Sequence, residues 1–343
     1  MAKKKASSLE ISDIRVKYDK NDGSLRITSK DPDLKGKPFT LTVTGNSPTA
    51  ETLFELMRDH GLVEEAKLPT DLTIKSETVL KEFYDPTKPL QFVLGETYGK
   101  ELATIDLSDM PHMFVSGGTG SGKSILLHSL ARQIGLRNDF QLTIFDPTGI
   151  QWPQDDLRAQ DRTLQSNEAL AVELEQLEDE LQYRQYSMNA EAVNHVAQTK
   201  NPPKYRVLML DYASHFFLGE GVDKNDGVAM AKHELAKQRL FRLLRLGRSA
   251  GIYVILSTQK FDLETLPNEI LDLIPIRIAM GSNGYMASAA LLGKKPLYGK
   301  GILDRPGRGV LSLHGKQTPF QAYRVDTSGS NRDRMLKMLR TVN

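Results

Sequence analysis

The feature that most constrains this chain is a glycine-rich run at residues 117–124, which reads Gly-Gly-Thr-Gly-Ser-Gly-Lys-Ser. It matches the pattern G-x-x-x-x-G-K-[ST], in which glycines allow consecutive backbone N–H groups to converge on phosphate oxygens. The apolar run at 113–116 comes directly before it, and a helical pattern begins at Lys123. A strand, a phosphate-binding loop and a helix in this order predict an α/β fold that binds a nucleotide.

The motif also assigns a role to each residue type. Lys123 offers a positive charge to the β and γ phosphates, and the Ser124 hydroxyl is a ligand for Mg²⁺. The expected nucleotide-binding residues are Gly117, Gly118, Thr119, Gly120, Ser121, Gly122, Lys123, Ser124 and Ile125.

The amino-acid composition excludes several classes of protein. The 343 residues are 39% hydrophobic and 26% charged, which is typical of a globular protein. The absence of cysteine excludes a disulfide scaffold, thiolate catalysis and cysteine-ligated zinc or iron–sulfur clusters. No apolar run approaches the roughly 18 residues of a membrane span, and the start MAKKKASSLE has no apolar core of a signal peptide. We therefore expect a cytoplasmic protein without a membrane span of its own.

The spacing of apolar residues predicts two domains. Residues 1–88 are expected to form a small α+β module and linker, with a hairpin turn at 20–23 and a helix over 50–60. Residues 89–343 alternate strands with helices, so a mostly parallel sheet is expected there. The expected strands are 113–116, 142–145, 207–210, 252–257 and 276–280, and the expected long helices are 167–198 and 229–248.

A phosphate-binding loop needs a carboxylate at the end of a neighbouring strand to hold the Mg²⁺ shell. Asp211 ends the apolar run 207–210 and is the preferred candidate, whereas Asp146 ends another strand and is expected to organise a turn. Gln259 follows the strand at 252–257, where an amide can sense the γ-phosphate or orient the attacking water.

Arginines recur at every third position from 239 to 248. This stripe is either a solvated helix face or, at Arg248, a group that reaches the nucleotide of a neighbouring subunit. Trp152 is expected to pack rather than to stack on a base, and the seven histidines show no spacing of metal ligands.

Positive charge is concentrated at the carboxyl-terminal end. Residues 290–343 hold eleven Lys and Arg against three Asp, a net charge of +8, whereas the whole chain carries +2. Such a segment is either a solvated face or a surface for a polyanion.

Several segments, in order, resemble the FtsK/SpoIIIE group of P-loop DNA translocases within the wider HerA-like ATPases. The approach to the loop at 89–116, the Asp-Pro pair at 146–147 and the helix around Tyr183-Arg184 are similar to that family. So are the segment Arg248–Lys260 and the strand Ile274–Ala279. The likeness covers roughly residues 89–325.

The resemblance implies a RecA-like ATPase core, in most members a hexameric ring that translocates double-stranded DNA with ATP and Mg²⁺. It implies Lys123 and Ser124 at the phosphates and Mg²⁺, Asp211 as the Walker B acid and Gln259 as the γ-phosphate sensor. Arg248 and Arg277 become candidates for contact with a neighbouring subunit's nucleotide. It also places a basic loop near DNA, with the candidate contacts Lys294, Lys295, Lys300, Arg305 and Arg308.

The chain also departs from the family pattern. Tyr212 stands where the family has a catalytic glutamate after the Walker B aspartate, which leaves hydrolysis slow, lost, or dependent on another acid such as Glu220. We therefore expect either a DNA translocase or DNA-transfer motor, with a membrane or relaxase-type protein partner, or a nucleotide-switched assembly scaffold. The family's membrane helices and carboxyl-terminal winged-helix module are not recognised in these 343 residues.

Overall fold

The structure is a computed structural model of the chain. It describes most of residues 84–325 and the backbone of four short strands before them. The described ranges are 14–19, 24–29, 40–43, 73–74, 84–97, 101–152, 157–259, 268–281, 291–292 and 306–325. The chain divides into two compact units, Met1–Leu68 and Pro69–Asn343. The boundary near residue 88 stays a prediction.

The first unit contains a small antiparallel sheet. Its strands are β1 (Ile14–Asp19), β2 (Ser24–Ser29) and β3 (Thr40–Val43), in the order β1-β2-β3. Asp19 pairs with Ser24 across the turn, so the predicted hairpin is confirmed. The helix expected over 50–60 lies outside the described residues.

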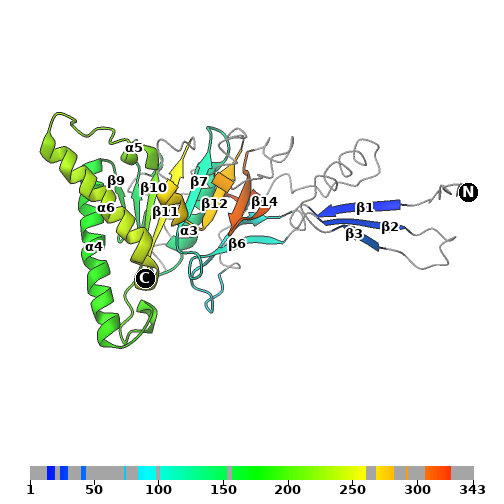
Figure 1. Cartoon of the computed structure of the whole chain (residues 1–343), viewed down its shortest axis with the longest axis horizontal. Helices are drawn as coiled ribbons and strands as arrows, with labels where there is room; N and C mark the ends of the chain where they lie inside the picture. The colour runs from blue at the N-terminus through cyan, green and yellow to red at the C-terminus, as the bar shows by residue number, and fades with distance from the viewer. Residues whose placement is uncertain are drawn as a thin grey trace, which may run out of the picture. The chain divides into compact units, whose positions relative to one another are not determined.

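The second unit is built on a ten-stranded sheet (Figure 1). Its strands are β5 (Gln91–Glu96), β6 (Leu102–Asp106), β7 (Met113–Gly117), β8 (Phe140–Phe145), β9 (Arg162–Leu164), β10 (Tyr205–Asp211), β11 (Ile252–Thr258), β12 (Ile276–Met280), β13 (Arg308–Leu313) and β14 (Lys316–Ala322). The order is β6-β5-β14-β13-β12-β7-β11-β10-β8-β9.

The sheet is mixed, with a parallel half that contains every strand expected from the sequence. The six strands from β12 to β9 run parallel, as predicted for a RecA-like α/β core. Strands β13, β14, β5 and β6 extend it with antiparallel pairs that the sequence reasoning missed. In the centre, β11 lies between β7 and β10 and all its residues are buried. Burial on both faces explains its unbroken apolar run.

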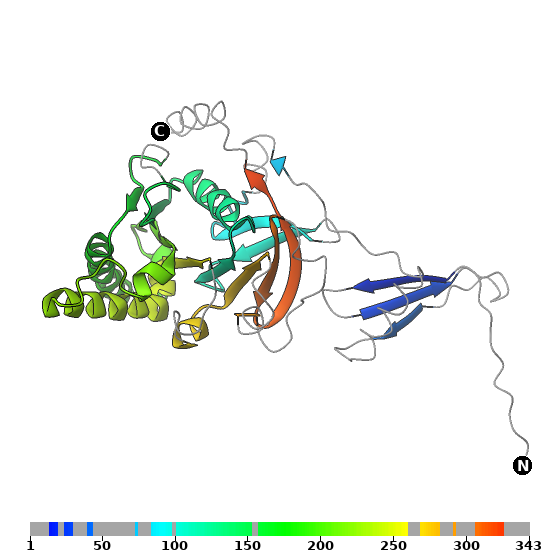
Figure 2. The same ribbon diagram turned by 90° about the horizontal axis from the view of Figure 1, so that it is seen from above.

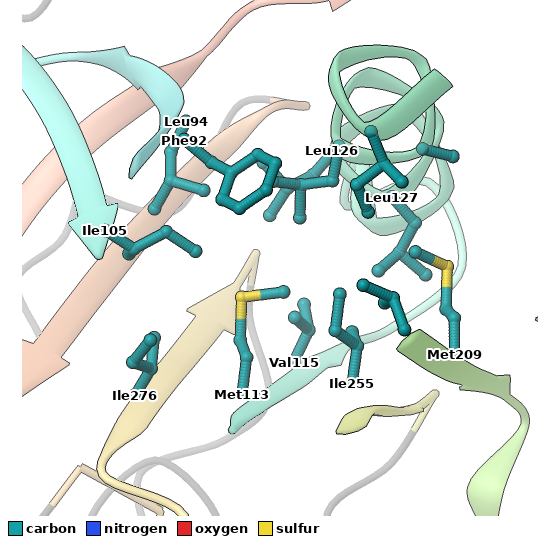
Figure 3. Packing of buried hydrophobic residues seen from close by; sticks show 14 of the residues in the cluster. Phe92, Leu94, Ile105, Met113, Val115, Leu126, Leu127, Met209, Ile255 and Ile276 are labelled. Atoms are coloured by element: carbon teal, nitrogen blue, oxygen red, sulfur yellow. The ribbon is translucent and has the colours of Figure 1, made fainter. Parts of the chain in front are cut away.

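Helices cover the two faces of the sheet (Figure 2). Helix α3 (Lys123–Gly135) packs on one face, where Phe92 of β5, Val115 of β7 and Leu126 of α3 share a hydrophobic cluster (Figure 3). On the other face, α4 (Asn167–Ala190) and α6 (Gly227–Ala250) pack against each other. Figure 1 shows these two long helices side by side.

Helix α4 buries one row of leucines and is shorter than predicted. Its leucines at 170, 174, 177 and 181 are buried in one cluster with leucines of α6. The helix was expected to continue to Gln198, yet it ends at Ala190, and a separate 3₁₀ turn, η3 (Val196–Gln198), follows. Ala192 has a φ of 54°, a left-handed conformation that a continuing right-handed helix does not contain.

The arginine stripe on α6 is only partly solvated. Arg239 lies 2.7 Å from Glu175, and Arg242 lies 2.7 Å from Glu178, both on α4. Arg245 and Arg248 are exposed. Two of the four arginines in the stripe therefore form ion pairs between α6 and α4.

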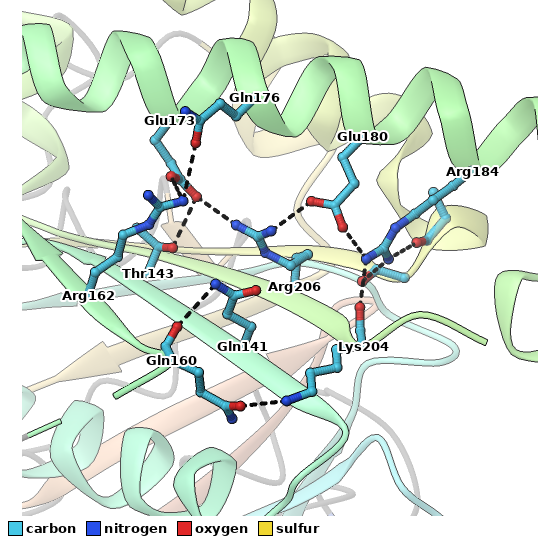
Figure 4. Close-up of polar contacts among 12 residues, drawn as sticks. Gln141, Thr143, Gln160, Arg162, Glu173, Gln176, Glu180, Arg184, Lys204 and Arg206 are labelled. Carbon is cyan, nitrogen blue, oxygen red and sulfur yellow. Dashed lines mark hydrogen bonds and ion pairs between the residues drawn. The ribbon is translucent and has the colours of Figure 1, made fainter. Parts of the chain in front are cut away.

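A buried polar network attaches α4 to the edge of the parallel sheet (Figure 4). The Glu173 carboxylate lies 2.9 Å from Arg206 of β10 and 2.5 Å from Arg162 of β9, and it accepts a hydrogen bond from Thr143 of β8 at 3.0 Å. Glu180 lies 2.7 Å from the other end of the same Arg206 guanidinium. The network attaches α4 to β8, β9 and β10. Strand β10 ends at Asp211, one of the predicted site residues.

We expect Glu173→Ala to lower the free energy of unfolding by about 3 kcal/mol, because it leaves the largely buried Arg206 with only the partly exposed Glu180 as a partner. Glu175→Ala on the same helix is the control. Glu175 is 55% exposed and pairs with Arg239, so its loss should cost less than about 1 kcal/mol. Urea denaturation of both variants measures the difference, and equal losses would contradict the assigned role of Glu173.

A second prediction concerns His112, which is fully buried before β7 and accepts a hydrogen bond from the Val254 amide through Nδ1 at 3.0 Å. Burial lowers the pKa of His112 to about 3, so the folded protein holds it neutral. Between its unfolded value of about 6.5 and this value, only the unfolded chain takes up the proton. The contribution of neutral His112 to the free energy of unfolding is therefore fully present above about pH 6.5 and decreases as the pH is lowered.

His112→Asn keeps an acceptor for Val254 but cannot titrate. We expect the difference in unfolding free energy between wild type and this variant to shrink by roughly 2 kcal/mol from pH 7 to pH 5, since each pH unit contributes about 1.4 kcal/mol. Urea denaturation at the two pH values measures it. A difference that does not change with pH would show that His112 is not held neutral.

Candidate nucleotide-binding site

The glycine-rich loop connects β7 to α3 at the carboxyl edge of the parallel strands. Gly120 has a φ of 80° and Gly122 a φ of 94°, conformations that favour glycine. A Cβ at Gly122 would also lie 2.5 Å from the backbone nitrogen of Gly307. That same Gly307 amide donates to the Ser121 carbonyl at 2.7 Å. The glycines are therefore required by the loop's own shape and by the segment before β13 that holds it.

The first turn of α3 follows the glycine-rich loop, and its Lys123 amide donates to the Ser121 hydroxyl at 3.4 Å. Its N-cap residue, Gly122, provides no side-chain cap, and no acidic residue lies in the first turn. The N-terminal amides and the positive end of the helix dipole favour an anion. Ser124 and Ile125, both partly exposed, belong to this turn. This arrangement suits a phosphate group.

Lys123, directly after this loop, forms a buried ion pair. Its Nζ lies 2.7 Å from Oδ1 of Asp211 and donates to the Ser257 hydroxyl at 3.0 Å. The Ser257 hydroxyl in turn donates to the same Oδ1 at 2.7 Å. Three neighbouring strand ends, from β7, β11 and β10, thus place these groups in contact. The sequence reasoning assigned no role to Ser257, although it stands opposite Asp211 in the strand register.

Asp211 is held ionised by this environment. Burial by itself would raise the pKa of Asp211, but the charge of Lys123 and the hydrogen bonds from Lys123, Ser257 and Trp152 lower it overall. An ionised carboxylate at this position can accept the water shell of Mg²⁺, with Ser124 as a second oxygen ligand. The residues therefore fit a Mg²⁺–nucleotide complex, while the metal roles of Ser124 and Asp211 stay predictions.

Asp146, the competing carboxylate, serves a different purpose. Its Oδ1 accepts hydrogen bonds from the Thr148 amide and hydroxyl, and its Oδ2 from the amides of Gln151 and Trp152. These bonds close the turn after β8. The turn-organising role expected for Asp146 is therefore the one it has in this structure.

Gln259 and Tyr212 lie next to each other at the tips of β11 and β10. The Gln259 side-chain amide donates to the Tyr212 hydroxyl at 3.1 Å. The Tyr212 ring centroid lies 5.4 Å from Nζ of Lys123, and its φ of 74° is left-handed. The residue that departs from the family pattern is therefore part of the site, in direct contact with the proposed γ-phosphate sensor.

The other predicted site residues lie apart from this cluster. Arg248 is exposed and donates to the Ser108 carbonyl at 2.8 Å. The Arg277 guanidinium donates to the carbonyls of Ile274 and Leu271 near the end of α7 (Asn268–Asp272). A contact with a neighbouring nucleotide would require Arg277 to leave these bonds. Glu220, the alternative acid, is exposed and pairs with His215.

Most of the predicted basic loop lies outside the described residues. Lys294, Lys295, Lys300 and Arg305 lie outside the described residues, and Arg308 begins β13. Within the described residues, no group of three or more His, Asp or Glu side chains is arranged to hold a metal ion by itself. Among the helices of that same part, none has the length and apolar character of a membrane span.

Comparison with known sequences identifies relatives of this loop and its surroundings. The model of the FtsK/SpoIIIE family matches residues 77–210. A DNA translocase FtsK of Staphylococcus aureus (strain Mu50) is 23% identical over 270 residues, covering 72% of this chain and 33% of the relative. The DNA translocase FtsK of Lactococcus lactis subsp. cremoris is 27% identical over 237 residues, covering 65% and 31%. The chain thus spans about a third of the length of these relatives.

Solved structures share the fold. The pCW3 conjugation coupling protein TcpA, in a monomer form with ATPγS, superposes with a TM-score of 0.71 at 18% identity, covering 94% of this chain and 92% of that one. ATPases 2 and 3 of EssC from Geobacillus thermodenitrificans superpose with a TM-score of 0.59 at 16% identity, covering 80% and 52%. Residues 77–210, which contain the glycine-rich loop, are thus similar to the FtsK/SpoIIIE family, and the core that holds them has the RecA-like P-loop fold.

Proposed function

We propose that this chain is an ATPase whose hydrolysis drives movement or transfer of double-stranded DNA. One observation carries the nucleotide part of the proposal. Lys123, at the start of a helix whose N-cap residue provides no side-chain cap, lies 2.7 Å from the ionised Asp211 across the central strands. In phosphoryl transfer the protein positions the phosphates and neutralises their charge, and it forms no covalent bond itself. The arrangement of Lys123 and Asp211 suits that role.

The ion pair gives the site two states. In the structure, Lys123 neutralises Asp211, which favours burial of both groups. When phosphates occupy the loop, Lys123 exchanges Asp211 for the β and γ oxygens, and Oδ1 of Asp211 loses its contact with Lys123. A bound Mg²⁺ supplies charge neutralisation of the phosphates. Binding therefore costs one buried ion pair and gains several charged contacts.

Gln259 is proposed to sense the γ-phosphate or to orient the attacking water, because it lies at the tip of β11, two residues after Ser257, which contacts Lys123 and Asp211. In this structure the amide is bonded to Tyr212. Tyr212 cannot accept a proton from water as a carboxylate does, so we expect slow basal hydrolysis. Glu220 is the alternative acid, and it would have to leave His215 to act.

The DNA part of the proposal is supported by the curated relatives, which are described as DNA translocases, and by the conjugation coupling protein among the structural neighbours. The net positive charge of residues 290–343 suits the phosphate backbone, so binding should be salt-sensitive and independent of sequence. We propose a ring-shaped homo-oligomer, a hexamer by resemblance, with Arg248 and Arg277 as inter-subunit candidates. It would act in the cytoplasm and be recruited by a membrane or relaxase-type partner, with residues 1–88 as a separate module.

We expect linear double-stranded DNA to stimulate ATP hydrolysis by the full-length chain at least severalfold, and the stimulation to fade as salt rises. Release of phosphate is measured with and without DNA at low and moderate salt. Ser124→Ala should abolish turnover while leaving the Lys123–Asp211 pair intact, and Lys123→Ala should abolish it as well. Turnover that is equal with and without DNA would contradict the motor.

A second function, a nucleotide-switched assembly scaffold, is favoured by Tyr212. In that case the site binds ATP to oligomerise or recruit a partner, and hydrolysis has been lost. The contact of Tyr212 with Gln259 would then hold the sensor away from a water molecule.

Tyr212→Glu separates the two functions. If the chain is a motor adapted to Tyr212, we expect turnover to fall or stay unchanged, because the glutamate removes the bond to Gln259 and adds a negative charge near Lys123 and Asp211. Tyr212→Phe, which removes only the hydroxyl, is the matched control. A gain of tenfold or more with glutamate alone, measured as kcat, would favour the scaffold.

A further inference from the structure

Trp152 is the only tryptophan of the chain, and it is 3% exposed. Its side chain was expected to pack in the core, and it does belong to the hydrophobic cluster under α3. It also makes a polar contact that packing alone does not require. The indole Nε1–H donates to Oδ2 of Asp211 at 3.1 Å.

The Trp152 backbone is anchored from two sides. Its amide donates to Oδ2 of Asp146 at 3.1 Å, and its carbonyl accepts a hydrogen bond from the Thr163 hydroxyl at 2.9 Å. The first bond fixes it to the end of β8 and the second to β9. The indole N–H is therefore presented to Asp211 from a fixed frame, as a group that orients a functional side chain must be.

The ring is anchored as well. It stacks on the imidazole of His128, with ring centroids 3.9 Å apart and an angle of 30° between the planes. His128 lies on α3, the helix that begins at Lys123. Trp152 thus connects the helix after the phosphate-binding loop with the carboxylate at the end of β10.

The two oxygens of Asp211 have different donors. Oδ1 faces Lys123 and Ser257, whereas Oδ2 is bonded to Trp152. Departure of Lys123 to the phosphates removes a donor from Oδ1 and leaves the bond at Oδ2 unchanged. The bond to Trp152 then keeps the orientation of the carboxylate, with Oδ1 bonded to Ser257 and no longer to Lys123.

We propose that Trp152 is a positioning residue, whose indole N–H holds Oδ2 of Asp211 so that Oδ1 is presented to the Mg²⁺ shell of the bound nucleotide. This role rests on the proposed nucleotide binding and adds to it a residue outside the loop and strand-tip motifs. Groups that orient a metal-binding side chain in this way are worth about 10–100-fold in metal affinity.

Trp152→Phe tests the role, because it retains a ring to stack on His128 and removes the N–H. The affinity for ATPγS is measured by equilibrium dialysis of the full-length protein, once with Mg²⁺ and once with excess EDTA. We expect the variant to bind at least tenfold more weakly than wild type with Mg²⁺ and within twofold of wild type in EDTA.

Phe140→Leu is the matched control. Phe140 is a fully buried aromatic residue of the same hydrophobic cluster, but it begins β8, at the opposite end of the strand from the site. Its substitution should lower stability without a Mg²⁺-specific loss of affinity. A loss in Trp152→Phe that is equal with and without Mg²⁺, or no loss in either, would overturn the positioning role. Failure of wild type to bind ATPγS at all would overturn the proposed function, and the role with it.

A measurement on the wild-type protein keeps the test independent of any variant's folding. With ¹⁵N-labelled tryptophan the chain gives a single indole N–H signal, from Trp152. We expect this N–H to stay protected from solvent exchange when Mg²⁺ and ATPγS are added, since the bond to Oδ2 persists. Loss of protection on nucleotide binding would show that Trp152 releases Asp211, contrary to the proposal.

Discussion

The buried ion pair between Lys123 and Asp211 depends on the parallel order of the central strands. Two charges at this depth are tolerated because each neutralises the other and because Ser257 and Trp152 donate to the same carboxylate. These groups come from strands and connections far apart in the chain. They meet because β7, β11 and β10 run in the same direction and end at one edge, where ligand sites of α/β sheets lie.

The rest of the second unit supports that edge. The paired helices α4 and α6 cover one face, and the network around Glu173 and Arg206 joins α4 to β8, β9 and β10. On the other face, α3 packs over the core with the glycine-rich loop at its start. Strand β13 and the segment before it close the loop from the side through Gly307 and Ser121. The antiparallel strands therefore help to shape the site.

Much of the fold was accessible from the sequence, because parallel strands buried on both faces appear as short apolar runs bounded by turn residues. All five expected strands lie in the parallel half of the sheet. The antiparallel strands were missed because runs such as those of β13 and β14 alternate weakly and follow one another without a helix between them. The end of α4 was misplaced because a left-handed alanine at 192, rather than a proline or glycine, follows the helix.

The phosphate-binding loop, the preference for Asp211 over Asp146 and the position of Gln259 follow from residue types at the ends of apolar runs, which are visible in the amino-acid sequence. Which of these groups contact one another depends on the folded arrangement of the strands. It joined Ser257 and Trp152 to Asp211 and placed Tyr212 on Gln259. It also bonded the Arg277 guanidinium to the carbonyls of Leu271, Ile274 and Leu291. These contacts follow from strand order and register, which local residue patterns do not encode.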